Sequence, residues 1–137
     1  MARRLSHVAT LVALRKHALA YPGAAEEFPW GDRVAKVNQK IFVFLGRDSD
    51  PAGLRLSVKL PMSCAGALLL PFTAPTGYGL GKAGWVSVTI PPDEAPPVEL
   101  LLAWIDESYR AIAPKRVVAT LDAKREDGAT PRAKARR

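Results

Sequence analysis

The sequence is poor in the residues from which disulfides and metal sites are built. Its 137 residues include one cysteine, Cys64, and two histidines, His7 and His17. A lone cysteine forms no intramolecular disulfide, which excludes a disulfide-stapled secreted module. No cysteine, histidine or carboxylate cluster has the spacing of metal ligands. We therefore expect no metal and no cofactor, and we expect Cys64 to be a reduced, buried small hydrophobe.

The sequence also lacks a long hydrophobic run. A membrane-spanning helix needs about 18 or more consecutive apolar residues, and no segment here reaches that length. Residues 8–14 are apolar, but His7 precedes them and Arg15-Lys16-His17 follows them directly. A secretory leader stays uncharged almost to its cleavage site. We expect no membrane association and a cytoplasmic location.

Acidic residues are outnumbered, with 13 Asp and Glu against 20 Lys and Arg, for a formal net charge of +7. A basic excess is typical of proteins that bind polyanions such as nucleic acid. Residues 1–121 hold 14 basic and 10 acidic side chains, and residues 122–137 hold 6 and 3. The last segment has no apolar residue larger than alanine. We predict one domain over 1–121 and a flexible basic tail over 122–137, which either solubilises the chain or adds phosphate contacts.

Hydrophobic periodicity predicts two amphipathic helices. Leu11, Leu14, Ala18 and Tyr21 follow one face of the first helix. The clearest pattern covers residues 98–112, where apolar side chains recur at i, i+3, i+4, i+7 and i+11. A third, short helix is predicted within residues 61–70, between two prolines.

Strand signals lie between the two long helices. Residues 54–60 alternate apolar and polar side chains, which is typical of a half-buried strand. Residues 85–90 are rich in β-branched and aromatic side chains, which favour a strand. Two β-rich runs within 33–45 flank Asn38-Gln39-Lys40 and predict a hairpin. Residues 117–121 form either one more strand or a segment that lies over the core.

This order of elements predicts an α+β fold. Three or four strands joined by hairpins pair in an antiparallel sheet. Two amphipathic helices each need an apolar surface to cover, and one face of the sheet provides it. We predict a two-layer sandwich in which the N- and C-terminal helices pack on one face of an antiparallel sheet.

No catalytic motif is present. Gly79, Gly81 and Gly84 match G-x-G-x-x-G by count, but a strand is predicted after them, whereas a dinucleotide site needs a helix there. The chain has neither G-x-S-x-G nor a Cys–His pair at a known spacing. His17, next to Arg15 and Lys16, is interpreted as a solvated helix residue. We therefore expect no catalytic residue and no enzyme activity.

Several short motifs, in order along residues 11–113, resemble the MmcQ/YjbR family of small bacterial proteins labelled as DNA-binding. The matching pieces are Tyr21-Pro-Gly-Ala-Ala-Glu-Glu-Phe28, Val34-Ala-Lys-Val-Asn-Gln-Lys-Ile-Phe42, Leu56-Ser-Val-Lys-Leu60, Gly77-Tyr78 with Trp85, and Leu101-Leu-Ala-Trp-Ile-Asp-Glu-Ser-Tyr109. The resemblance implies a CyaY-like (frataxin-like) sandwich and DNA binding through a double wing of sheet and loops. Many members carry His and Asn in the loop where this chain has Gly79 and Gly81, and a His in place of Gly84.

The frataxin-like resemblance also suggests iron, which such proteins bind through an acidic ridge. The first helix of this chain carries Arg15 and Lys16 and no acid. Hard cations need clustered oxygen ligands. Iron binding is therefore not expected.

Basic residues recur on or beside the predicted strands. If Arg55 and Lys59 share the solvent face of the sheet with Lys36, that face is basic and suits DNA phosphates. The full set of expected DNA-binding residues, some of them carried by the resemblance, is Lys36, Lys40, Arg55, Lys59, Lys82, Tyr78 and Trp85. The alternative is a protein-interaction or small-ligand-binding domain with no nucleic-acid role, in which Tyr78, Trp85 and Trp30 ring an apolar cleft under the glycine-rich loop of residues 77–84. The identity of a protein partner is left open.

Overall fold

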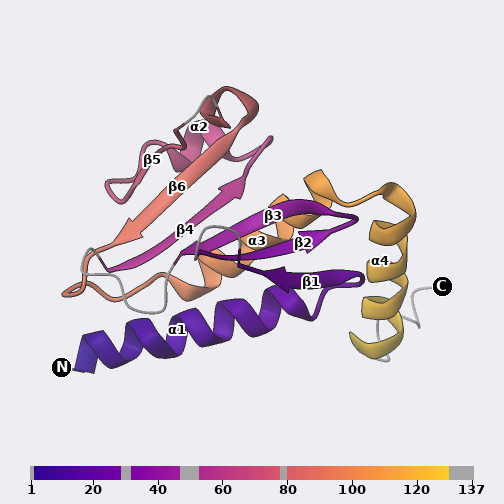
Figure 1. Cartoon of the computed structure of the whole chain (residues 1–137), viewed down its shortest axis with the longest axis horizontal. Coiled ribbons are helices and arrows are strands. Elements are labelled where there is room, and N and C mark those ends of the chain that lie inside the picture. The colour runs from indigo at the N-terminus through magenta and orange to yellow at the C-terminus, as the bar shows by residue number, and fades with distance from the viewer. Residues whose placement is uncertain (1, 29–31, 47–52, 78–79, 130–137) are drawn as a thin grey trace.

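Six strands form one antiparallel sheet in the order β1-β2-β3-β4-β6-β5 (Figure 1). The computed structural model describes residues 2–28, 32–46, 53–77 and 80–129. Neighbouring strands in the sheet are mostly neighbours in the sequence, as hairpin connections require. The strands are β1 (Ala24–Glu27), β2 (Arg33–Val37), β3 (Lys40–Gly46), β4 (Leu54–Lys59), β5 (Thr73–Pro75) and β6 (Trp85–Ile90).

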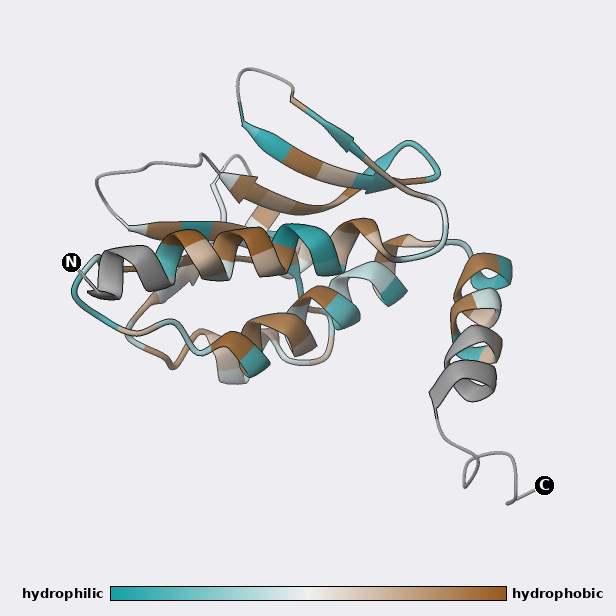
Figure 2. Cartoon of the chain, turned by 90° about the horizontal axis from the view of Figure 1, so that it is seen from below, coloured by the Kyte–Doolittle hydropathy of each residue, from teal (hydrophilic) through white to brown (hydrophobic). Residues whose placement is uncertain are grey.

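Two long helices, α1 (Ala2–Leu19) and α3 (Val98–Ile112), pack side by side against this sheet (Figure 2). Leu14 of α1 and Ile105 of α3 are fully buried in one cluster with the apolar side chains of β4 and β6. This arrangement confirms the predicted α+β fold, with the N- and C-terminal amphipathic helices on one face of an antiparallel sheet. Three further elements are α2 (Cys64–Ala67), the 3-10 turn η2 (Leu80–Ala83) and α4 (Lys115–Ala129).

The predicted hairpin is confirmed, and its turn consists of Asn38 and Gln39. Both residues have positive φ angles, 52° and 67°. Two central residues in the left-handed region define the tight turn whose twist matches that of antiparallel strands. The register between β2 and β3 then shifts twice, so that Phe42 and Val43 are both buried in the core. Such β-bulges place two successive residues against one residue of the partner strand.

The structure corrects three predictions about the elements and decides one alternative. The sheet has six strands rather than three or four, because the short strands β1 and β5 were not predicted. Of the two alternatives for residues 117–121, the second holds: they form no strand but belong to α4, with Leu121 in the core and Val117 and Val118 packed against it. Helix α4 continues to residue 129, which removes the predicted end of regular structure at residue 121; residues 130–137 of the predicted tail lie outside the described residues. In the segment 61–70 only Cys64–Ala67 is α-helical, and Cys64 itself is half-buried rather than buried.

Candidate functional site

A single row of residues crosses the sheet and defines its outer face, the face away from α1 and α3. The row runs through paired positions on all six strands: Glu27, Val34, Phe44, Ser57, Ser87 and Ala74. The residues next to this row in the sequence, such as Ala35, Val43 and Val58, lie in the core under the helices. Since side chains alternate between the faces of a strand, the row and the residues two positions away from it share the outer face.

Three of the predicted cations lie on this outer face. Lys36 is two residues from Val34 on β2, and Arg55 and Lys59 are two residues on either side of Ser57 on β4. The structure therefore brings together the three residues for which the sequence analysis required a shared face. Lys36 Nζ lies 3.2 Å from Glu27 Oε1, which partly neutralises that end of the face.

Charge is strongly biased along the strands. Strands β2 to β6 contain Arg33, Lys36, Lys40, Arg55 and Lys59, and they contain no Asp or Glu. Both strand carboxylates, Glu26 and Glu27, belong to β1 at the edge of the sheet. Glu26 is held by two arginines, with its Oε2 atom 2.5 Å from Arg15 Nε and 2.9 Å from Arg33 Nε. On the outer face the cations Lys36, Arg55 and Lys59 come from β2 and β4, and β3 and β6 add no carboxylate to them.

The other predicted site residues are not gathered on this face. Lys40 pairs with Val37, whose side chain is in the core, so the register places Lys40 on the helix side at the hairpin end. Lys82 is exposed in η2, outside the sheet. Tyr78 and Trp30 lie outside the described residues.

Trp85 is on the outer face but is largely buried. Its side chain is 7% exposed, and its ring meets the Phe44 ring edge-on at a centroid distance of 5.5 Å. Edge-to-face aromatic pairs of this kind stabilise packing. Trp85 therefore packs on the sheet between Lys59, its cross-strand partner, and Phe44.

A chain of hydroxyl groups on the same face was missed by the sequence analysis. Ser57 Oγ lies 2.9 Å from Ser87 Oγ, and Thr76 Oγ1 lies 2.9 Å from the same Ser87 atom. Both serines occupy polar positions of predicted strands, which is the only signal that the sequence offered. Their contact depends on the pairing of two strands that are 30 residues apart.

The backbone of β4 is fixed from the opposite side by Ser108 of α3. The Ser108 hydroxyl donates to the Phe42 carbonyl at 2.5 Å and accepts a hydrogen bond from the Lys59 backbone N–H at 2.8 Å. Ser108 is fully buried. A buried hydroxyl with both a donor and an acceptor partner is a rigid connection, and it sets the position from which the Lys59 side chain leaves the sheet.

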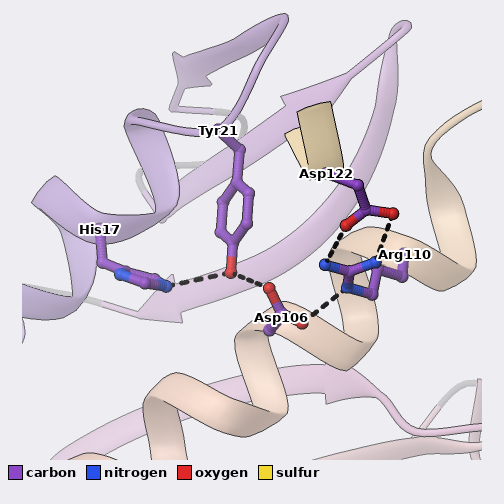
Figure 3. Close-up of polar contacts among 5 residues, drawn as sticks. All are labelled: His17, Tyr21, Asp106, Arg110 and Asp122. Carbon is purple, nitrogen blue, oxygen red and sulfur yellow. Dashed lines mark hydrogen bonds and ion pairs between the residues drawn. The ribbon is translucent and has the colours of Figure 1, made fainter. Parts of the chain in front are cut away.

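A second polar network connects α1, α3 and α4 (Figure 3). The Tyr21 hydroxyl donates to Asp106 Oδ1 at 2.9 Å and lies 3.0 Å from His17 Nε2, so His17 is not simply solvated as the sequence suggested. Arg110 Nε donates to Asp106 Oδ2 at 2.8 Å, and its Nη2 lies 2.8 Å from Asp122 Oδ1. Hydrogen bonds to Asp122 and then to Asp106 raise the pKa of Arg110. Because Asp122 belongs to α4, Arg110 fastens that helix to the body of the protein.

Two further features are absent from the described residues. No group of three or more His, Cys, Asp or Glu residues within the described ranges is placed to hold a metal ion. Among the helices in those same ranges, none combines the length and the apolar character needed to cross a membrane.

Comparisons with known proteins agree with the fold. The family model described as YjbR matches residues 19–111. Among solved structures, Deinococcus radiodurans protein DR2400, assigned to the DUF419 domain family, is 31% identical with a TM-score of 0.59. The match covers 72% of this chain and 75% of that protein. No curated protein matches.

Proposed function

The chain belongs to the YjbR family, and from that premise we propose that it is a DNA-binding domain whose outer sheet face contacts backbone phosphates. The observation that carries the proposal is the charge on this face. Lys36, Arg55 and Lys59 share it, and Glu27 is the one carboxylate among the strand residues assigned to it. The proposed role is binding in the cytoplasm rather than catalysis.

The spacing of these cations suits a polyanion. Lys36 and Lys59 lie on strands separated by one strand, about 10 Å apart across the sheet, and Arg55 lies about 13 Å from Lys59 along β4. Duplex DNA carries one phosphate per roughly 3.4 Å of each strand along the axis. Three cations spread over such distances each meet a separate phosphate. Phosphate contacts read no bases, so the expected binding depends little on sequence.

The proposal is tested by removing two charges from the outer face. The double variant Arg55→Gln/Lys59→Gln removes both charges and keeps the first methylene groups of both side chains. We expect it to bind a labelled 16-bp duplex about a hundredfold more weakly at 50 mM salt, from roughly tenfold per lost phosphate contact. Fluorescence anisotropy measures the change.

A matched control removes the same charge from elsewhere. Lys40→Gln/Lys115→Gln changes two exposed lysines, one on the helix side of the hairpin end and one on α4. The control is expected to stay within about threefold of the wild-type affinity, because only weak long-range attraction is lost. Equal losses in the two double variants would refute the outer face as the interface.

A further inference from the structure

The α2 segment, residues 61–70, exposes an apolar face. Hydrogen bonds from the Cys64 N–H to the Leu60 carbonyl at 3.0 Å and from the Leu69 N–H to the Gly66 carbonyl at 3.2 Å extend α2 by helical turns in both directions. Residues at i, i+3, i+4 and i+7 therefore share one side of the segment. The exposed residues on that side are Met62, Ala65, Gly66 and Leu69. Met62 is 88% exposed and Leu69 is 85% exposed, the highest values among the exposed large hydrophobic residues.

Hydrogen bonds to α3 and β5 fix this segment in place. The Glu107 carboxylate of α3 accepts from the backbone N–H groups of Met62 at 2.8 Å and of Ser63 at 3.0 Å. The Thr73 hydroxyl of β5 donates to the Ala67 carbonyl at 2.6 Å, and the Ala67 side chain is buried in the core. A helical segment that is apolar on all sides is normally covered on all sides. The core covers one side of the α2 segment, and the described residues leave the other side exposed.

The fold of a single chain does not require glycine at residue 66. Gly66 lies within α2, its φ angle is not positive, and a Cβ atom added there would meet nothing within 4 Å. Glycine destabilises a helix relative to alanine, so this glycine has a cost without a benefit inside the described chain. Glycine also allows another backbone to approach closely. Gly66 and Ala65 form the low centre of the exposed face, between the large side chains of Met62 and Leu69.

The neighbouring edge of the sheet, strand β5, is closed to the addition of a strand (Figure 1). Residues 72 and 76 bond to β6 through their backbones, so the backbone groups of residues 73 and 75 point away from it. The Thr73 N–H bonds to the Leu70 carbonyl at 3.3 Å, and Pro75 has no N–H. A partner of this region is therefore recognised by side-chain packing on the α2 segment.

The distribution of charge favours a second copy of the chain as that partner. Residues 60–81 contain no charged side chain, which is the longest such stretch in a sequence with a net charge of +7. A two-fold interface places the same patch of both copies together, so a charged patch meets its own charge. The exposed face of the α2 segment meets none. An acidic or basic partner would gain no attraction from this face.

We infer that two copies of the chain dimerise through their α2 segments, packed antiparallel about a two-fold axis. An axis that passes between Ala65 and Gly66 places Met62 of each copy opposite Leu69 of the other. The small central residues let the segments approach, and the large residues pack on either side. Four residues are few beside the roughly 20–30 per side of a standard interface, so the dimer is expected to be weak. The inference goes beyond DNA binding and does not depend on it.

Sedimentation velocity of nucleic-acid-free protein, at concentrations on the order of 1 µM to 1 mM, measures this dimer. Met62→Lys and Leu69→Glu each place a charge in the interface twice, and each is expected to raise the dissociation constant about a hundredfold. The double variant Met62→Lys/Leu69→Glu brings opposite charges face to face and is expected to recover most of the affinity. Gly66→Leu fills the centre of the face and is expected to prevent dimerisation, although its own chain leaves room for the Cβ atom.

The matched control is Val12→Glu, which changes an apolar side chain of α1 that is 57% exposed. Thermal unfolding shows that each variant is folded. A wild-type dimer that the three single variants weaken, the double variant recovers and the control leaves unchanged supports the inference. A monomer at every concentration overturns it, as does a dimer that Met62→Lys leaves unchanged or that the double variant fails to recover. Because no DNA is present, every outcome is independent of the proposed function.

Discussion

Salt dependence offers a quantitative test of the outer face. Each phosphate neutralised by a protein cation contributes about 0.9 to the slope of log affinity against log salt. Lys36, Arg55 and Lys59 together are expected to contribute about 2.7. The triple variant Lys36→Gln/Arg55→Gln/Lys59→Gln should therefore have a slope smaller by about 2.7 than the wild type.

This difference is large on a practical scale. Between 50 and 200 mM salt, a contribution of 2.7 to the slope amounts to about a fortyfold change in affinity. Wild-type affinity should thus fall by about forty times more than that of the triple variant over this range. Anisotropy titrations of a labelled duplex at four salt concentrations give both slopes.

A triple control variant accounts for the effect of net charge. Lys40→Gln/Lys115→Gln/Arg116→Gln also removes three positive charges, but from exposed residues that do not lie on the outer face. Its slope is expected to stay within about 0.9 of the wild type. A slope for the outer-face variant equal to that of the control would refute the reasoning, because the basic residues elsewhere in the chain would then carry the binding.

Three further predictions concern single residues. Glu27→Gln frees Lys36 from its carboxylate partner and should strengthen duplex binding about two- to fivefold, as expected for an exposed ion pair; weaker binding in anisotropy would contradict it. Ser108→Ala leaves the Lys59 backbone N–H without its acceptor and should lower the free energy of unfolding by about 1–3 kcal/mol in urea titrations, whereas an unchanged midpoint would argue against this connection. Burial raises the pKa of Tyr109 above its usual 10.0. The stability tied to the neutral phenol is therefore present below pH 10 and is lost as the pH rises through the higher pKa of the folded state. Tyr109→Phe should reduce this alkaline loss of stability in unfolding measured against pH, and identical pH curves for the two proteins would contradict the prediction.

Elements with a strong local pattern were predictable from the sequence. The predicted strand in residues 54–60 and the predicted helix of residues 98–112 are both confirmed. In each segment, the spacing of the apolar residues fits only one type of secondary structure. Strand β1 has the sequence Ala-Ala-Glu-Glu, which has little β propensity. It is a strand because all four of its residues pair antiparallel with β2. Tertiary pairing of this kind has no local signal.

The C-terminal helix shows the opposite difficulty. Val117 and Val118 favour a strand by propensity, yet they lie in α4. Their backbone N–H groups both bond to the Pro114 carbonyl, which starts a helical turn. Leu121 is then buried in the core, and the ion pair between Arg110 and Asp122 fastens the next turn. Long-range packing outweighs propensity at this point.

The candidate site was predictable only in part. The alternation of residues 54–60 placed Arg55 and Lys59 on one face of the sheet. No such pattern showed that Lys36 and Lys40 lie on different faces. The turn at Asn38 and Gln39 separates these two lysines, since Lys40 pairs with Val37 and falls on the helix side. Cross-strand register decides which cations meet, and register depends on which residues form the turn and on bulges such as the one at Phe42, neither of which the hairpin prediction specified.

Amide chemical-shift mapping with a duplex most directly tests whether the outer face binds DNA. Titration of ¹⁵N-labelled protein with a 16-bp duplex should produce its largest shifts at outer-face positions, chiefly Lys36, Ser57, Lys59 and Ser87. The exposed side of α1 should change little. Shifts confined to α1, α3 or α4, with the outer face unaffected, would contradict the proposed interface.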